Sequence, residues 1–90
     1  EALGVVESRF VSPAIQAADR AVKRSEVRLL KFVSGQGIAG KAFFVLAGDV
    51  AAVRESVDAA REALGSRLVE AVVIPSPAES LARALTGAVR

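Results

Sequence analysis

Three glycines and a lysine near the middle of the chain match two nucleotide-binding patterns at once. Gly35, Gly37 and Gly40 form G-x-G-x-x-G, and Gly35, Gly40 and Lys41 form G-x-x-x-x-G-K. Both kinds of site need a helix directly after the glycines, because its amides and dipole point at the phosphate. The residues after Lys41 are AFFVLA, an aromatic and β-branched segment that predicts a strand, and Ala42 replaces the Ser or Thr that binds magnesium in a P-loop. We therefore expect no nucleotide at this loop.

A hairpin connection is the simplest interpretation of the same segment, because glycine permits positive φ. Two residues are enough to close a hairpin, however, whereas this connection is longer and carries no charge from Val33 to Gly40. Small uncharged residues are useful where several copies of one loop approach a symmetry axis, because glycine lets backbones come close together. The residues alone leave both interpretations open.

The composition excludes several kinds of functional site. The chain contains no histidine and no cysteine, so the commonest general base, the commonest metal ligand and all thiolate chemistry are missing. We expect no enzymatic activity, no metal and no cofactor, and the absence of cysteine argues against an iron–sulfur cluster. The net charge is only +2, with scattered basic residues, so nucleic-acid binding is not expected.

The chain is unusually apolar for its size. Hydrophobic residues make up 52% of its 90 residues and charged residues only 24%, although a domain this small has much surface to cover. The longest uncharged segments, such as 42–48 and 71–78, fall far short of the ~20 residues that span a bilayer. We therefore expect burial against identical copies or a close partner rather than in a membrane. Residues 1–10 have no signal-peptide pattern, so the cytoplasm is the expected compartment.

Hydrophobic periodicity predicts one α/β (α+β) domain over residues 1–90, with the order β-α-β-β-α-β of the ferredoxin-like fold and a short C-terminal helix. Strands are predicted at 2–7, 27–33, 42–47 and 68–74, and helices at about 13–24 and 50–64. Ser12 and Asp49 are the expected N-caps of these helices, with Pro13 at the first helical position and Gly65 just past the second helix. A capping box, Ser76 to Glu79, would begin the terminal helix.

Each predicted helix has one apolar face. The first carries mostly alanine there: Ala14, Ala17, Ala18, Ala21 and Val22. The second has a stripe of Val50, Val53, Val57, Ala60 and Leu64, with charged residues on the opposite face. Phe43 and Phe44 are neighbours on a strand, so they point to opposite faces and at least one belongs to the core.

In combination, four segments resemble the BMC-domain family of bacterial microcompartment shell proteins. ALGVVES is similar to the family's first strand, and AIQAADRAVKRSEVRLL to its first helix and second strand. GIAGKAFFVLAGDVAAVRESVDAA resembles the pore loop, third strand and second helix, and VVIPSPAESL resembles the junction between the last strand and the tail. The resemblance runs in the right order from about Ala2 to Leu85, and it depends on the combination rather than on any single motif.

The resemblance implies a structural shell tile with the BMC fold that forms a cyclic hexamer, or a trimer of tandem domains, around a pore for small metabolites. The implied partners are copies of the chain and other shell proteins, with encapsulated enzymes as further candidates, and the implied location is a microcompartment shell in the cytoplasm. The resemblance implies neither nucleic acid nor a membrane as a partner. Carried onto this chain, the pore-lining residues would be Gln36, Gly37, Ile38, Ala39 and Gly40, and Lys23 would lie at the rim where tiles meet.

Two departures from the family pattern leave alternatives open. Ser76 stands between two prolines where many hexamer-forming members have an arginine, which puts the usual edge contact in doubt. GIAGKAFF is more similar to the second half of a tandem, trimer-forming member, so a single-domain hexamer and half of a tandem are both consistent. Lys23 also fits an ordinary solvated helix end, where lysine complements the helix dipole. The alternative function is an oligomeric ferredoxin-like regulatory domain that binds a small molecule between subunits.

Overall fold

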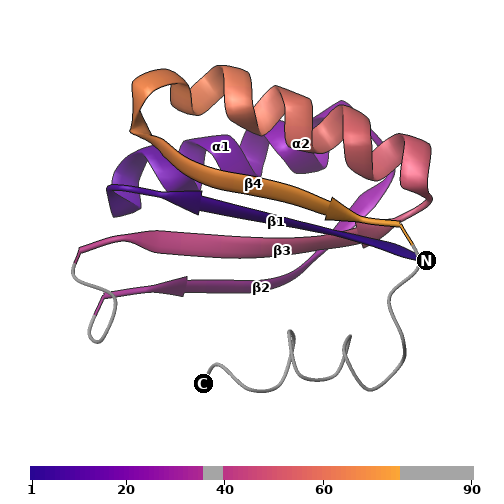
Figure 1. The fold of residues 1–90 in the computed structure, drawn as a ribbon, viewed down its shortest axis with the longest axis horizontal. Coiled ribbons are helices and arrows are strands. Elements are labelled where there is room, and N and C mark those ends of the chain that lie inside the picture. Colours follow the sequence, from indigo (N-terminus) through magenta and orange to yellow (C-terminus); the bar gives the residue numbers. More distant parts are fainter. Residues whose placement is uncertain (36–39, 76–90) are drawn as a thin grey trace.

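Four strands form one antiparallel sheet, and two helices cover one of its faces (Figure 1). The computed structural model describes residues 1–35 and 40–75. The elements are β1 (Ala2–Ser8), α1 (Val11–Arg24), β2 (Val27–Ser34), β3 (Ala42–Gly48), α2 (Val50–Leu64), a 3₁₀ turn η1 (Gly65–Arg67) and β4 (Leu68–Ile74). Their order confirms the predicted ferredoxin-like arrangement, while the terminal helix predicted from Ser76 lies outside the described residues. In the described part of the chain, neither helix is long and apolar enough to cross a membrane.

The strand order β2-β3-β1-β4 puts β1 and β3 inside the sheet and leaves β2 and β4 as its two edges. Ala42 pairs with both Ser8 of β1 and Ser34 of β2, so the connection at 35–40 lies at one end of the sheet. Gly48 pairs with both Ala2 and Val27, which places the end of α1 and the start of β2 at the opposite end. We call the connection at 35–40 the glycine loop. Every strand runs between the end of the sheet that carries this connection and the end that carries the turn after α1 (Figure 1).

The larger core lies between the helices and the sheet. Phe44 and Leu46 of β3 and Val6 of β1 are fully buried there, and the ring of Phe44 stacks on Phe32 with a centroid separation of 6.2 Å. Phe43 belongs to a second cluster on the other face of the sheet, which confirms that the two neighbouring phenylalanines point in opposite directions. Apolar burial on both faces accounts for much of the high hydrophobic content of the chain.

Small residues let the helices lie close to the sheet and to each other. The four alanines at positions 14, 17, 18 and 21 are all buried on α1. A Cβ atom at Gly4 of β1 would lie 2.7 Å from Val57 Cγ2 and 2.9 Å from Val53 Cγ1 of α2, closer than carbon atoms can approach. Gly4 is therefore required by the close contact between β1 and α2.

The predicted start of α1 was wrong by two residues. The helix begins at Val11 with Phe10 at the N-cap position, and no side chain accepts a hydrogen bond from its first turn. Pro13 consequently sits third in the helix rather than first. This is tolerated because the N–H groups of the first turn have no partner inside the helix, so a missing N–H costs little at any of these positions.

The second helix has the predicted bounds but not the whole predicted apolar stripe. Asp49 occupies the N-cap position, although its side chain makes no capping hydrogen bond, and Gly65 ends the helix with φ 54°. Val50 is 39% exposed, whereas Ser56 is fully buried and its Oγ has no hydrogen-bond partner among the described residues. The helix is thus rotated so that Ser56 faces the interior and Val50 does not.

Substitution of Gly4→Ala is expected to lower the free energy of unfolding by about 1–3 kcal/mol, because the added methyl group overpacks the contact with α2. Chemical denaturation of the purified protein measures this change. The double variant Gly4→Ala/Val57→Ala is the control, since it makes room for the new methyl group. Additive losses in that double variant would show that close packing is not the reason for glycine at this position.

Substitution of Ser56→Ala should leave the stability unchanged or raise it by about 1 kcal/mol, because it removes a buried hydroxyl that has no partner. The same denaturation experiment applies. Ala60→Ser, at another buried position of α2, is the matched control and should destabilise the domain. A clear loss of stability in Ser56→Ala would mean that the hydroxyl is satisfied in solution.

Candidate functional site

The first and last glycines of the glycine loop have left-handed backbone conformations. Gly35 has φ 91° and Gly40 has φ 80°, and nothing lies within 4 Å of a Cβ atom built at either residue. The requirement for glycine is therefore conformational rather than steric. Of the five predicted pore residues, the structure describes Gly40, which is exposed at the end of the loop. Residues 36–39 lie outside the described residues.

The segment that follows the loop shows whether the two nucleotide-binding patterns have the helix that they need. Lys41 is exposed and directly precedes β3, which begins at Ala42. A phosphate site of either kind would have a helix in that place. The structure confirms the predicted strand, so the helix that such a site requires is missing at this place.

Lys23 lies in the last turn of α1, at the end of the domain opposite to the glycine loop. Its Nζ is 3.1 Å from Oδ2 of Asp19, one helical turn earlier, and the two side chains are 73% and 57% exposed. A solvated i,i+4 pair of this kind contributes about 0.2–0.5 kcal/mol. Most of the lysine side chain therefore remains accessible for a contact with another molecule.

The length of the sheet separates the two predicted sites. β1 has seven residues, and at about 3.3 Å per residue it spans about 23 Å. The end of β2 and the start of β3, which flank the loop, lie at one end of this span and the last turn of α1 lies at the other (Figure 1). The structure thus does not bring Lys23 and Gly40 together, and a single site cannot contain both.

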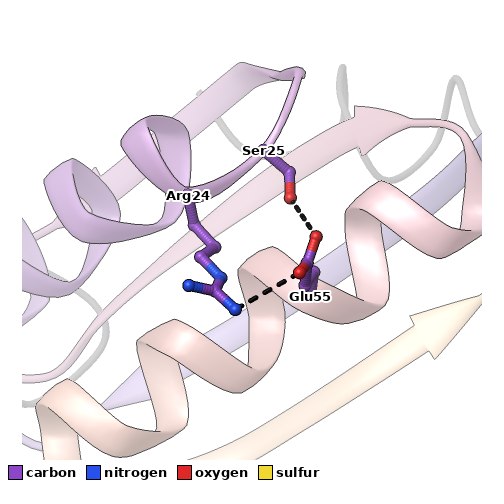
Figure 2. A network of polar contacts seen from close by, with 3 residues as sticks. All are labelled: Arg24, Ser25 and Glu55. Carbon is purple, nitrogen blue, oxygen red and sulfur yellow. Dashed lines mark hydrogen bonds and ion pairs between the residues drawn. The ribbon is translucent and has the colours of Figure 1, made fainter.

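A polar network holds the turn after α1 against α2 (Figure 2). Arg24 Nη2 donates a hydrogen bond of 3.2 Å to Glu55 Oε2, and Ser25 Oγ donates one of 2.8 Å to Oε1 of the same carboxylate. The carboxylate therefore links the last residue of α1 and the first residue of the turn to the second helix. This contact links the backbone next to Lys23 to α2, and its contribution to stability is small because both side chains of the ion pair are more than half exposed.

A second ion pair lies near the same end of the sheet. Arg28 forms a bidentate contact with Glu1, at 2.8 Å from Nη2 to Oε1 and 2.6 Å from Nη1 to Oε2. The hydrogen bond from Arg28 lowers the pKa of the Glu1 carboxyl from its ordinary value. Both side chains are at least half exposed, so this is a surface contact that links β2 to the start of β1.

The described residues contain no group of three or more acidic side chains placed to hold a metal ion. They do expose apolar side chains that the sequence analysis did not single out. Leu29 is 44% exposed on the edge strand β2, and Val69 and Val72 are 39% and 40% exposed on the edge strand β4. No local pattern marks these residues, because they resemble core residues of a strand until the strand order is known.

Comparison with known proteins identifies close relatives over nearly the whole chain. Residues 2–77 match the protein family described as the BMC domain. The chain is 46% identical over 85 residues to the bacterial microcompartment shell protein PduT of Citrobacter freundii, covering 92% of this chain and 46% of PduT. It is 38% identical over 90 residues to the carboxysome shell protein CsoS1A of Hydrogenovibrio crunogenus, covering 94% of this chain and 90% of that protein.

The fold comparison agrees. A crystal structure of a microcompartment protein from Desulfitobacterium hafniense superimposes with a TM-score of 0.87 at 45% identity, covering 92% of this chain and 47% of that one. The chain therefore spans about half the length of two of these relatives and nearly the whole length of the third.

Substitution of Gly35→Ala or Gly40→Ala is expected to lower the free energy of unfolding by about 1 kcal/mol each, although both sites have open space. The reason is that alanine is strained at positive φ. Thermal or chemical unfolding measures the effect, with Ser34→Ala on the neighbouring strand end as a control that should change little. Equal stability of all three variants would mean that the loop does not require left-handed residues.

Proposed function

The chain belongs to the BMC-domain family, and from this premise we propose that residues 1–90 form one structural tile of a bacterial microcompartment shell. In this proposal the tile is part of a cyclic hexamer or pseudohexamer in the cytoplasm, and it is not an enzyme. The names of the relatives support the role in a shell. The proposed ring rests on one observation: the ends of the strands that flank the glycine loop and the turn of α1 that carries Lys23 lie at opposite ends of the sheet.

A ring explains why these two features are far apart. When copies stand side by side around an axis, the same end of every copy faces the centre and the other end faces the rim. With the loop end inward, the uncharged residues between Gly35 and Lys41 meet their equivalents around a pore. Lys23 then lies at the rim, where it contacts the next tile.

The chemistry of the loop suggests what the pore passes. Gln36, Gly37, Ile38, Ala39 and Gly40 are the proposed lining. Backbone amides and a side-chain amide around a narrow opening favour small polar or anionic metabolites over cations. Lys41, which is exposed next to Gly40, adds positive potential at the mouth of the pore.

Two assemblies satisfy the same geometry. A chain of this length forms a hexamer by itself, and as half of a longer chain it forms a trimer with six domains. The resemblance of GIAGKAFF to tandem members and the double length of two relatives support the second form. The nearly equal length of CsoS1A supports the first.

Size-exclusion chromatography with light scattering, followed by electron microscopy, tests the proposal. We expect a ring of six domains that forms sheets, tubes or larger shells as the concentration rises. The alternative, a small-molecule-sensing domain, predicts a discrete oligomer that never tiles and whose melting temperature rises with a ligand such as a nucleotide or an amino acid. That result would replace the shell proposal.

The substitution Ile38→Glu should reduce the passage of small anions through assembled shells at least several-fold, because it adds a ring of negative charge to the pore. Gly37→Trp should reduce the passage of all solutes by narrowing the opening. Uptake of a charged dye and a neutral dye into purified shells measures both effects. Glu62→Gln, on the exposed face of α2, is the control. Unchanged permeability in both pore variants would remove the loop from this role.

The substitution Lys23→Glu should abolish sheets in electron micrographs while the mass of the ring in solution stays the same, because only the contact between tiles is lost. Asp19→Asn is the matched control, since it breaks the ion pair with Lys23 but keeps the lysine. If the control loses its sheets equally, or if Lys23→Glu still forms them, the rim assignment is wrong.

A further inference from the structure

We infer that Glu55 is a positioning residue, which holds the end of α1 in place so that Lys23 can contact the next tile. The inference deepens the proposed function and rests on the rim assignment of Lys23. Glu55 lies on α2 and acts through Arg24 and Ser25, the two residues after the lysine, with which its carboxylate forms hydrogen bonds (Figure 2).

The end of α1 lacks the local device that ends α2. Gly65 follows α2 with a positive φ of 54°, and its N–H donates a hydrogen bond to the carbonyl oxygen of Arg61. Ser25 follows α1 with extended backbone instead, at φ −147° and ψ 173°. An extended residue cannot form the backbone hydrogen bonds of the left-handed helix caps, so the chain after α1 does not close its last turn.

Apolar packing also stops short of this helix end. Ala21 is the last fully buried residue of α1, whereas Lys23 and Arg24 are exposed. The salt bridge of Lys23 is to Asp19 of the same helix, so it does not tie the helix end to the rest of the domain. Exposed helix ends without a cap open locally at little cost in free energy. A contact from another element is therefore needed to keep Lys23 in one position.

Glu55 supplies that contact from the neighbouring helix. Its Oε2 accepts a hydrogen bond of 3.2 Å from Arg24 Nη2, and its Oε1 accepts one of 2.8 Å from Ser25 Oγ. Both bonds involve the charged carboxylate, which makes them stronger than bonds between neutral groups. One side chain of α2 thus holds the last residue of α1 and the first residue after it.

The chain beyond Ser25 is held independently of Glu55. A Cβ atom at Gly48 would lie 3.0 Å from the carbonyl oxygen of Glu26, so the turn packs closely against the end of β3. The N–H of Val27, the first residue of β2, donates a hydrogen bond of 2.9 Å to the carbonyl oxygen of Ser25. Loss of the Glu55 contacts would therefore release only the end of α1, while the sheet stays intact.

The size of the expected effect follows from this local role. Both side chains of the ion pair between Arg24 and Glu55 are more than half exposed, so its loss shifts an equilibrium by only about twofold to fivefold. Such a shift is small for the unfolding of the whole domain, but it changes the populated fraction of a helix end that opens easily. Since a ring presents the same helix end several times at its rim, the loss is compounded in a lattice of rings.

The substitution Glu55→Ala tests the inference. We call the lowest protein concentration at which two-dimensional sheets form the tiling threshold, measured by light scattering and electron microscopy. This threshold should rise about fivefold or more, because fewer helix ends hold Lys23 in the position for contact. The mass of the ring in solution and the midpoint of thermal unfolding should change little. Amide hydrogen exchange should become faster in the last turn of α1 and stay the same in the sheet.

The matched controls separate position from charge. Asp58→Ala removes an acidic group that is also exposed on α2, one turn after Glu55, and should leave the tiling threshold unchanged. Glu55→Gln keeps an oxygen that accepts the hydrogen bond from Ser25, so it should recover part of the loss. In the background Arg24→Ala/Ser25→Ala, the substitution Glu55→Ala should have no further effect, because the partners of the carboxylate are already absent.

The outcomes also separate this inference from the proposed function. If Lys23→Glu still forms sheets, the rim assignment is wrong and the inference falls with it. If Lys23→Glu abolishes sheets while Glu55→Ala forms them at the wild-type concentration, only the role of Glu55 is overturned. Equal losses in Glu55→Ala and Asp58→Ala would attribute the effect to charge and would also overturn it. If Glu55→Ala destabilises the whole domain, Ser25→Ala takes its place and should raise the tiling threshold in the same direction.

Discussion

The close contact between α2 and the central strand β1 is the constraint on which the rest of the structure depends. Gly4 has no side chain because Val53 and Val57 occupy the space where a Cβ atom would lie. The small buried side chains of α1, which are all alanine, let the other helix pack closely as well. Since both helices pack on the same face of a four-stranded sheet, the core reaches full burial with small side chains and few aromatic ones.

This packing also decides which parts of the surface remain uncovered. The helices cover the face of the sheet but not its edges, so β2 and β4 keep exposed aliphatic residues along their length. The surface ion pairs add little to the stability of the fold. The basic side chains of these pairs, Lys23, Arg24 and Arg28, are all more than half exposed. The apolar excess noted in the composition is thus divided between a dense interior and two edges that another domain can cover.

The same arrangement separates the two predicted sites along the strands. The glycine loop and the last turn of α1 are held at opposite ends by strands of seven or eight residues, and Glu55 links the turn after α1 to α2. In the proposed ring, one of these ends would face the axis and the other the rim.

Local sequence determined the parts of this protein that local physics controls. The 3.6-residue periodicity and the glycine after it set α2 at Val50–Leu64. The apolar segment that Pro75 ends set β4 at Leu68–Ile74, and both elements have the predicted bounds. The start of α1 was misplaced because a first turn accepts proline at several positions, and the burial of Ser56 was missed because a hydroxyl reads as polar wherever it lies. The edges of the sheet, and with them the exposure of Leu29 and Val72, came only from the tertiary structure. Strand order depends on pairing between residues far apart in the sequence, and no local pattern records which strand is left without a second neighbour.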